Sequence, residues 1–165
     1  MATRTIYLSL GSNVGDRAEN LRRAIWSLPA AGIHPLRLSS LYETQPLDFP
    51  AQRCFLNCVV EAQTTLLPLP LLHVLRRIEF RLGSRKLFAR GPRKVDLDVL
   101  LYGSAAIHSR EFNVPHPRMH RRRFVLVPLA EIAPALAHPQ WGTNAAGLLA
   151  RSPDRSQVRK VIATR

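Results

Sequence analysis

The sequence predicts an α+β sandwich, in which helices pack against an antiparallel sheet. Two kinds of segment indicate this class: short runs with the alternation of strands, and two longer amphipathic runs with helical spacing. Their order over the first 101 residues is strand, helix, two strands, helix, strand. The chain has 165 residues, 46% of them hydrophobic, which suits one domain with a sizeable core. We expect that domain to span residues 1–150.

The first strand is expected over residues 3–10, which alternate and are rich in Ile, Tyr and Leu. Residues 11–15 contain two glycines and predict a turn. Asp16 and Glu19 then have the spacing of a capping box. A helix from this point to about Leu28 follows, with one apolar stripe.

The second and third strands are expected over residues 34–45 and 54–64, joined by a proline-containing loop. Pro70 can open the second helix and Gly83 can end it. An apolar strand over residues 95–101 completes the order βαββαβ. That order is typical of a ferredoxin-like α+β sandwich.

The C-terminal third adds to this unit. We expect a hairpin-like stretch over residues 105–114 and a helix over about 121–131. Residues 151–165 are basic and polar around a short apolar core. They predict a C-terminal tail that is either mobile or an added edge strand.

Charge and cysteine content narrow the function class. Lys and Arg number 24 against 11 Asp and Glu, a formal charge of +13. This suits a nucleic acid or a nucleotide substrate. Coding bias rather than function is the alternative explanation for much of the arginine excess. No apolar run reaches the about 20 residues of a membrane span, so we expect a cytoplasmic protein. On a strand, Cys54 and Cys58 lie roughly 13 Å apart, too far for a disulfide.

Two carboxylates interrupt the apolar strand over residues 95–101. Asp96 and Asp98 point to the same side, roughly 6–7 Å apart along the strand, and Arg93 precedes them. Because buried neighbouring carboxylates need a cation, magnesium carrying a polyphosphate is one interpretation. Pairing with surface arginines is the other.

A histidine and several arginines form a second cationic group. His116 lies between two prolines, which favours either a rigid loop residue or a ligand-binding one. The arginines that follow suit triphosphate oxygens or a nucleic-acid backbone: Arg118, Arg121, Arg122 and Arg123. Glu79, near the end of the second helix, shares a helical face with Leu72 and Arg76 and can simply pair with that arginine.

Asn57 is a polar residue inside an apolar strand, so its amide needs partners. An amide donates and accepts at once, which suits a flat heterocycle. Phe55 and Phe124 could sandwich such a ring, or could both be core residues.

Together these segments resemble the 6-hydroxymethyl-7,8-dihydropterin pyrophosphokinase family of folate biosynthesis. The resemblance covers about residues 4–150 in one colinear order. Its motifs are Ile6–Asn13, Ser39–Thr44, Phe55–Asn57, Arg77–Glu79, Gly91–Asp98, Val114–Pro117 and Phe124–Pro134.

The resemblance implies the ferredoxin-like fold and a transfer of pyrophosphate from ATP to a pterin, with release of AMP. It implies that Asp96 and Asp98 bind two Mg²⁺ ions. It implies ATP contacts from Leu72, Arg76, Glu79, Lys86, Arg93, Val99, His116 and Arg122. It implies a pterin pocket made by Thr44, Gln45, Leu47, Phe55, Asn57 and Phe124. The expected partners are these two small molecules, and the expected state is a monomer.

The segment between Gly83 and Arg93 departs from the family pattern. It is one residue shorter, and Arg90 takes the place of a tryptophan. Arg85 or Lys86 would have to replace a catalytic arginine. Gln45 stands where a proline is common.

Two alternatives to this function remain open. One is a diverged relative that acts on another pterin. The other is a basic ferredoxin-like module that binds RNA. RNA-binding sheets carry stacking aromatics on their central strands, whereas residues 95–101 carry aspartates.

Overall fold

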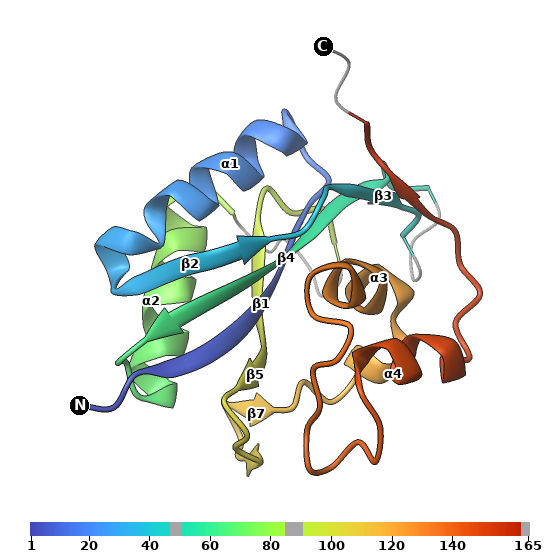
Figure 1. Cartoon of the computed structure of the whole chain (residues 1–165). Helices are drawn as coiled ribbons and strands as arrows, with labels where there is room; N and C mark the ends of the chain where they lie inside the picture. The colour runs from blue at the N-terminus through green and yellow to red at the C-terminus, as the bar shows by residue number, and fades with distance from the viewer. Residues whose placement is uncertain (47–50, 85–90, 163–165) are drawn as a thin grey trace.

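The structure is a computed structural model that describes residues 1–46, 51–84 and 91–162. Its centre is an antiparallel sheet in which β1 (Arg4–Ser12) lies between β5 (Asp96–Tyr102) and β4 (Phe55–Thr64) (Figure 1). The far edge of β4 pairs with two short strands, β2 (Ile33–Leu38) and β3 (Tyr42–Thr44). The architecture is therefore mixed α and β around an antiparallel sheet, as the sequence predicts.

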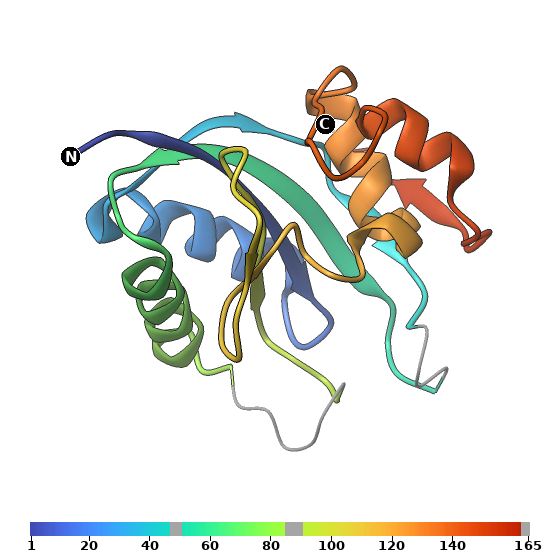
Figure 2. The same cartoon turned by 90° about the horizontal axis from the view of Figure 1, so that it is seen from below.

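Helices lie on both faces of this sheet (Figure 2). One face carries α1 (Arg17–Ser27) and α2 (Pro68–Arg81), and the main hydrophobic core lies beneath them. The other face carries α3 (Arg123–Ile132) and α4 (Ala145–Arg151) over a second cluster. This second pair covers only part of its face, and the rest of that face holds the candidate site.

Half of the expected capping box is present at the start of α1, where Asp16 Oδ1 accepts a hydrogen bond from Glu19 N at 3.0 Å. The Glu19 carboxylate pairs with Arg22 instead of returning to Asp16. The second helix begins at Pro68 rather than Pro70. Two prolines fit its first turn because the backbone N–H groups there have no helical acceptor. Its buried stripe includes Leu71, Leu75 and Ile78.

Two strand predictions were wrong in detail. The expected turn at residues 11–15 starts too early, because β1 continues through Gly11 to Ser12. The single strand expected over residues 34–45 is two strands, β2 and β3. Between them Ser39 N donates to Val59 O at 2.9 Å, and Ser39 Oγ accepts from Val59 N at 2.9 Å. The serine side chain replaces a backbone acceptor there, so the chain follows β4 without remaining a regular strand.

The C-terminal additions pack against the sheet. A two-stranded sheet forms from β6 (Ile107–His108) and β7 (Asn113–Val114), and a short 3₁₀ turn over Met119–Arg121 precedes α3. Beyond α4, β8 (Val158–Lys160) pairs with β3. These three residues of the tail form an added edge strand, one of the two alternatives that the sequence left open.

Candidate active site

Two neighbouring rows of residues cross the uncovered part of the sheet. In the first row Asp96 lies opposite Gly11, and Gly11 lies opposite Asn57. In the second row Asp98 lies opposite Ser9. Directly opposed residues of antiparallel strands project to the same face. The register therefore brings the carboxylates of β5 and the amide of β4 to one surface, on either side of β1.

Gly11 lets the Asn57 amide lie close against β1. A Cβ atom at this position would lie 2.9 Å from Asn57 Oδ1 and 3.6 Å from Phe55 Cδ1. Any larger residue would therefore fill the space beside the amide. The local sequence pattern predicts Gly11 to be a turn residue. The available signal was a glycine at the end of an apolar strand, which often marks a close backbone approach by a ligand.

The sequence predicts that the Asn57 amide needs a hydrogen-bond partner, and Thr44 supplies one. Asn57 Nδ2 donates to Thr44 Oγ1 at 2.7 Å, and both residues are buried. This bond directs the amide oxygen toward Gly11. Phe55 lies two residues earlier on the same face of β4, and Phe124 packs against the cluster under α3. Gln45 is exposed next to this group, and Leu47 lies outside the described residues.

Arg93 and Asp96 form the ion pair that the sequence left as an alternative. Arg93 Nη1 lies 2.7 Å from Asp96 Oδ2, with side-chain exposures of 17% and 16%. Arg93 Nε is buried and has no hydrogen-bond partner among the described residues. Within the described part of the chain, this N–H is therefore unsatisfied and shielded from solvent.

The two carboxylates could contribute to a metal site only together with other ligands. Among residues 1–46, 51–84 and 91–162, no group of three or more His, Cys, Asp or Glu side chains could hold a metal ion. Asp96 and Asp98 supply two hard oxygen donor groups on one face of β5. Magnesium in phosphate-transfer sites commonly takes one or two carboxylates and fills its shell with water and substrate oxygens. The donor set therefore fits that kind of site and does not fit an all-protein metal cage.

Asn13, which the sequence analysis did not single out as a site residue, connects both sides of the site. Its backbone N–H donates to Arg93 O at 3.1 Å, and its Oδ1 accepts from Arg93 N at 2.8 Å. Its Nδ2 donates to Gln52 Oε1 at 3.0 Å and to Arg53 O at 3.4 Å. One buried amide thus joins the start of the aspartate strand to the segment before β4.

Glu79 contacts the strand that carries the aspartates. Its Oε1 accepts from Leu97 N at 2.7 Å, between Asp96 and Asp98. Arg76, its expected helical partner, instead lies 3.9 Å from Glu111 in an exposed pair. Leu72 packs against the main core.

Val99 lies in the main core under α1 and α2, so its side chain is on the opposite face from the aspartates. Arg85 and Lys86 lie outside the described residues. Ser84, just before them, donates through Oγ to Val95 O at 2.6 Å.

His116 is held as a neutral side chain. Its backbone N–H donates to Leu100 O at 2.9 Å, and its Nδ1 accepts from Arg118 N at 3.1 Å. Burial, reinforced by Arg122 and Arg118, lowers the pKa of His116 to about 4, and the opposing attraction of Asp96 is smaller. With Nδ1 accepting, Nε2 carries the proton and is a hydrogen-bond donor at neutral pH.

Arg122 lies beside the aromatic part of the site. Its guanidinium carbon is 5.5 Å from the centre of the Phe124 ring. The stretch before α3 therefore presents a cation next to the phenylalanine expected to contact the heterocycle.

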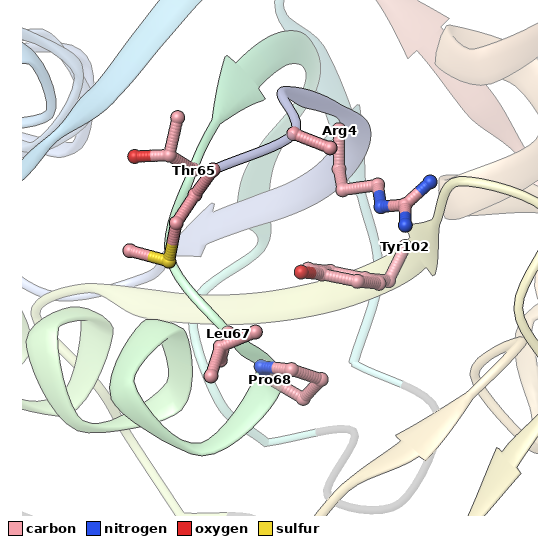
Figure 3. A pocket seen from close by; sticks show the side chains of 7 residues that line it. Arg4, Thr65, Leu67, Pro68 and Tyr102 are labelled. Atoms are coloured by element: carbon pink, nitrogen blue, oxygen red, sulfur yellow. The ribbon is translucent and has the colours of Figure 1, made fainter.

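A separate pocket of about 300 Å³ lies at the opposite end of β1 (Figure 3). Its lining residues are Met1, Ala2, Arg4, Thr65, Leu67, Pro68 and Tyr102. It includes neither aspartate, and its only lining residue on β1 is Arg4, the first residue of that strand, whereas the candidate site lies beside Gly11 near the other end. The pocket is therefore distinct from the candidate site.

Comparison with known proteins decides the family. The model of the family described as 7,8-dihydro-6-hydroxymethylpterin-pyrophosphokinase (HPPK) matches residues 7–134. The chain belongs to this family. The resemblance found in the sequence is confirmed, and with it the expectation of a pyrophosphokinase.

Curated relatives agree with this assignment. The chain is 46% identical over 127 residues to the 2-amino-4-hydroxy-6-hydroxymethyldihydropteridine pyrophosphokinase of Bacillus subtilis, which covers 76% of each chain. It is 41% identical over 135 residues to the protein of that name from Aquifex aeolicus, covering 82% of this chain and 84% of the relative. It is also 42% identical to the folic acid synthesis protein fol1 of Pneumocystis carinii, covering 90% of this chain and 20% of that protein.

Solved structures show the same fold. An HPPK-DHPS structure from Plasmodium falciparum matches with a TM-score of 0.74 at 16% identity, covering 91% of this chain and 45% of that one. In the described parts of this HPPK-family chain, no helix has the length and apolar character needed to cross a membrane.

Proposed function

We propose that the protein transfers pyrophosphate from ATP to the hydroxymethyl group of 6-hydroxymethyl-7,8-dihydropterin, with magnesium, as a step of folate synthesis. The substrate hydroxyl oxygen bonds to the β-phosphorus, the bond from that phosphorus to the oxygen of the α-phosphate breaks, and AMP leaves. The hydroxyl proton passes to water. The observation that carries the proposal is the register that places Asp96 and Asn57 on either side of Gly11.

The pterin would lie on the Asn57 side of Gly11. The amide oxygen lies close to Gly11 and can accept from the amino-pyrimidine edge of a pterin. Phe55 and Phe124 offer apolar surfaces for the ring, and Thr44 fixes the amide. Gln45 and Leu47 complete this pocket in the family pattern.

The triphosphate would lie on the Asp96 side. Asp96 and Asp98 would hold two magnesium ions, whose charge would offset that of the phosphate oxygens. Arg93 would hold those oxygens through its guanidinium, which the pair with Asp96 orients. His116 would donate through Nε2 without adding charge, and Arg122 would supply a further cation.

Most of the catalytic work assigned to the protein is positioning. Transfer of a phosphoryl-type group depends mainly on alignment and on charge stabilisation. Asp96, beside Gly11, faces both half-sites, so the incoming hydroxyl can meet the phosphate above β1. Glu79 fixes the backbone between the two aspartates. The family pattern adds nucleotide contacts from Leu72 and Arg76, and a catalytic or phosphate contact from Arg85 and Lys86. The contact it adds from Val99 would come from the backbone, because the Val99 side chain lies in the core on the opposite face.

We also propose that β1, α1, β2 with β3, β4, α2 and β5 constitute a ferredoxin-like βαββαβ unit. The sheet order β5-β1-β4, with β2 and β3 beside β4, supports this. The split second strand then counts as one strand of the unit.

The test is to incubate the protein with MgATP and hydroxymethyldihydropterin and to identify the nucleotide product. AMP supports the proposal, whereas ADP or no turnover contradicts it. Asp96→Asn and Asp98→Asn should each abolish magnesium-dependent ATP binding. Arg155→Ala, an exposed change on the tail, is the control and should retain it. If both aspartate variants still bind MgATP as the wild type does, the metal assignment is wrong.

A further inference from the structure

The described chain closes with a strand that borders the pterin side of the site. β8 pairs with β3 in antiparallel register, with Thr44 opposite Val158 and Glu43 opposite Arg159. Val161 N then donates to Leu41 O at 2.8 Å. Without β8, the three residues of β3 would be an exposed edge held from one side by β4, and strands this short are weakly fixed.

An ionic bridge strengthens this pairing on the helix side of the sheet. Arg159 Nη2 lies 2.5 Å from Glu43 Oε1, and Arg17 Nη2 lies 2.8 Å from Glu43 Oε2. Arg17 Nη1 also donates to Cys54 O at 2.8 Å. The two guanidinium groups, Arg17 first, lower the pKa of Glu43, so the carboxylate stays charged.

This bridge fixes the backbone that carries Thr44. Glu43 points toward α1, and Thr44, the next residue, points to the opposite face, where it holds the Asn57 amide. Arg17 ties the same carboxylate to Cys54, just before Phe55 at the start of β4. A shift of β3 would therefore rotate the Asn57 amide away from Gly11.

We propose that β8 positions the pterin half-site through the Arg159–Glu43–Arg17 bridge. Arg159 is a positioning residue, because it contacts β3 and does not touch the proposed substrate face. β8 lies beyond residue 134, where the match to the family model ends. This inference rests on the proposed function, since it assigns an effect on the dihydropterin.

The experiment compares Arg159→Ala, Arg159→Lys and a chain ending at Ser156 with the control Arg155→Ala. Arg155 and Arg159 are both exposed arginines of the same tail, so the two alanine variants lose the same charge. For each protein we would measure KM for hydroxymethyldihydropterin, kcat, the Kd of a non-hydrolysable MgATP analogue and the thermal midpoint.

We expect Arg159→Ala to raise KM for the dihydropterin about 2- to 5-fold, the range of a mostly exposed ion pair, with the nucleotide Kd unchanged. Arg159→Lys should restore most of that loss. Truncation at Ser156 should raise KM by about tenfold or more, because the strand pairing is lost as well.

Three outcomes would overturn the inference. The first is a dihydropterin KM in Arg159→Ala and in the truncated chain that matches Arg155→Ala. The second is a fall in thermal midpoint without a change in KM. The third is an equal loss of nucleotide and pterin affinity, which would indicate a general structural effect. Failure of the proposed function looks different, because the wild type itself would then form no AMP.

Discussion

Asn13 holds the backbone of Arg93 from both sides, accepting from its N–H at 2.8 Å and donating to its carbonyl at 3.1 Å. This pairing joins the end of β1 to the turn before β5. Because Arg93 also pairs with Asp96, the position of the guanidinium depends on a residue 80 positions earlier in the chain.

Removal of this amide should cost both stability and activity. In Asn13→Ala the Arg93 N–H loses its acceptor in a partly buried setting, which should lower the free energy of unfolding by about 1–3 kcal/mol. Asn13→Asp keeps the acceptor oxygen and loses the donation to Gln52 and Arg53. It should retain the Arg93 bond and weaken mainly dihydropterin binding. Urea unfolding measures the effect of each variant on stability, and KM for both substrates measures its effect on binding. Equal losses in Asn13→Ala and Asn13→Asp would contradict these separate roles of the two amide atoms.

Replacing Arg93 should slow the chemical step while leaving the fold intact. By comparison with arginines that stabilise phosphoryl transfer, Arg93→Ala should lower kcat by about 10³-fold or more. Arg93→Lys should recover only part, because an ammonium cannot copy the planar donor set. Rapid-quench measurement of AMP formation tests this, with circular dichroism as the check on folding. Unchanged turnover would remove Arg93 from the mechanism.

His116 should make stability depend on pH in a defined window. Its pKa falls from 6.5 to about 4 on folding, so below pH 6.5 the unfolded chain binds a proton that the folded protein does not. The contribution of His116 to the free energy of unfolding is therefore at its full value above pH 6.5. It declines as the pH falls to about 4, by up to about 3 kcal/mol, and is constant below that.

His116→Asn keeps an acceptor for Arg118 N and cannot titrate, so it serves as the matched comparison. The difference in unfolding free energy between wild type and variant should narrow as the pH falls from 6.5 to 4. Urea unfolding at pH 7.0, 5.5 and 4.5 measures it. A constant difference across these values would mean that His116 is not held neutral by the fold.

Adding one methyl group at Gly11, on the face of β1 that carries the candidate site, should weaken pterin binding selectively. In Gly11→Ala the new Cβ would lie 2.9 Å from Asn57 Oδ1, so the amide must move. We expect the Kd of the dihydropterin to rise by about tenfold or more while the Kd of MgATP changes little. Calorimetric titration with each ligand provides the comparison, and a variant that binds both as the wild type does would show that the space beside the amide is not used.

The sequence predicts the parts of this site that depend on local pattern. Asp96 and Asp98 alternate with buried apolar residues, so their shared face follows from strand geometry alone. The position of Asn57 in an apolar strand likewise indicates a partnered amide. Which residue supplies that partner depends on the pairing of β3 with β4, and no spacing along the chain predicts it.

Other features could not be predicted because they depend on contacts between distant segments. Gly11 looked like a turn residue because glycine favours turns, and only the register with Asn57 explains it as part of a strand. The break at Ser39 depends on hydrogen bonds to Val59. The pairing of Arg159 with Glu43 spans 116 positions, and any of the many arginines could have filled that role.

The placement of Gly11 on the middle strand has a consequence for how acceptor specificity can change. Adjacent strands are held about 4.8 Å apart by their backbone hydrogen bonds. The distance from β5 across β1 to β4 is therefore fixed, whatever side chains this face of the sheet carries. Accommodation of a bulkier or differently shaped acceptor must therefore come from the walls and rim of the site. Evolution and engineering alike can reshape those parts without altering the distance at which the two reactants meet.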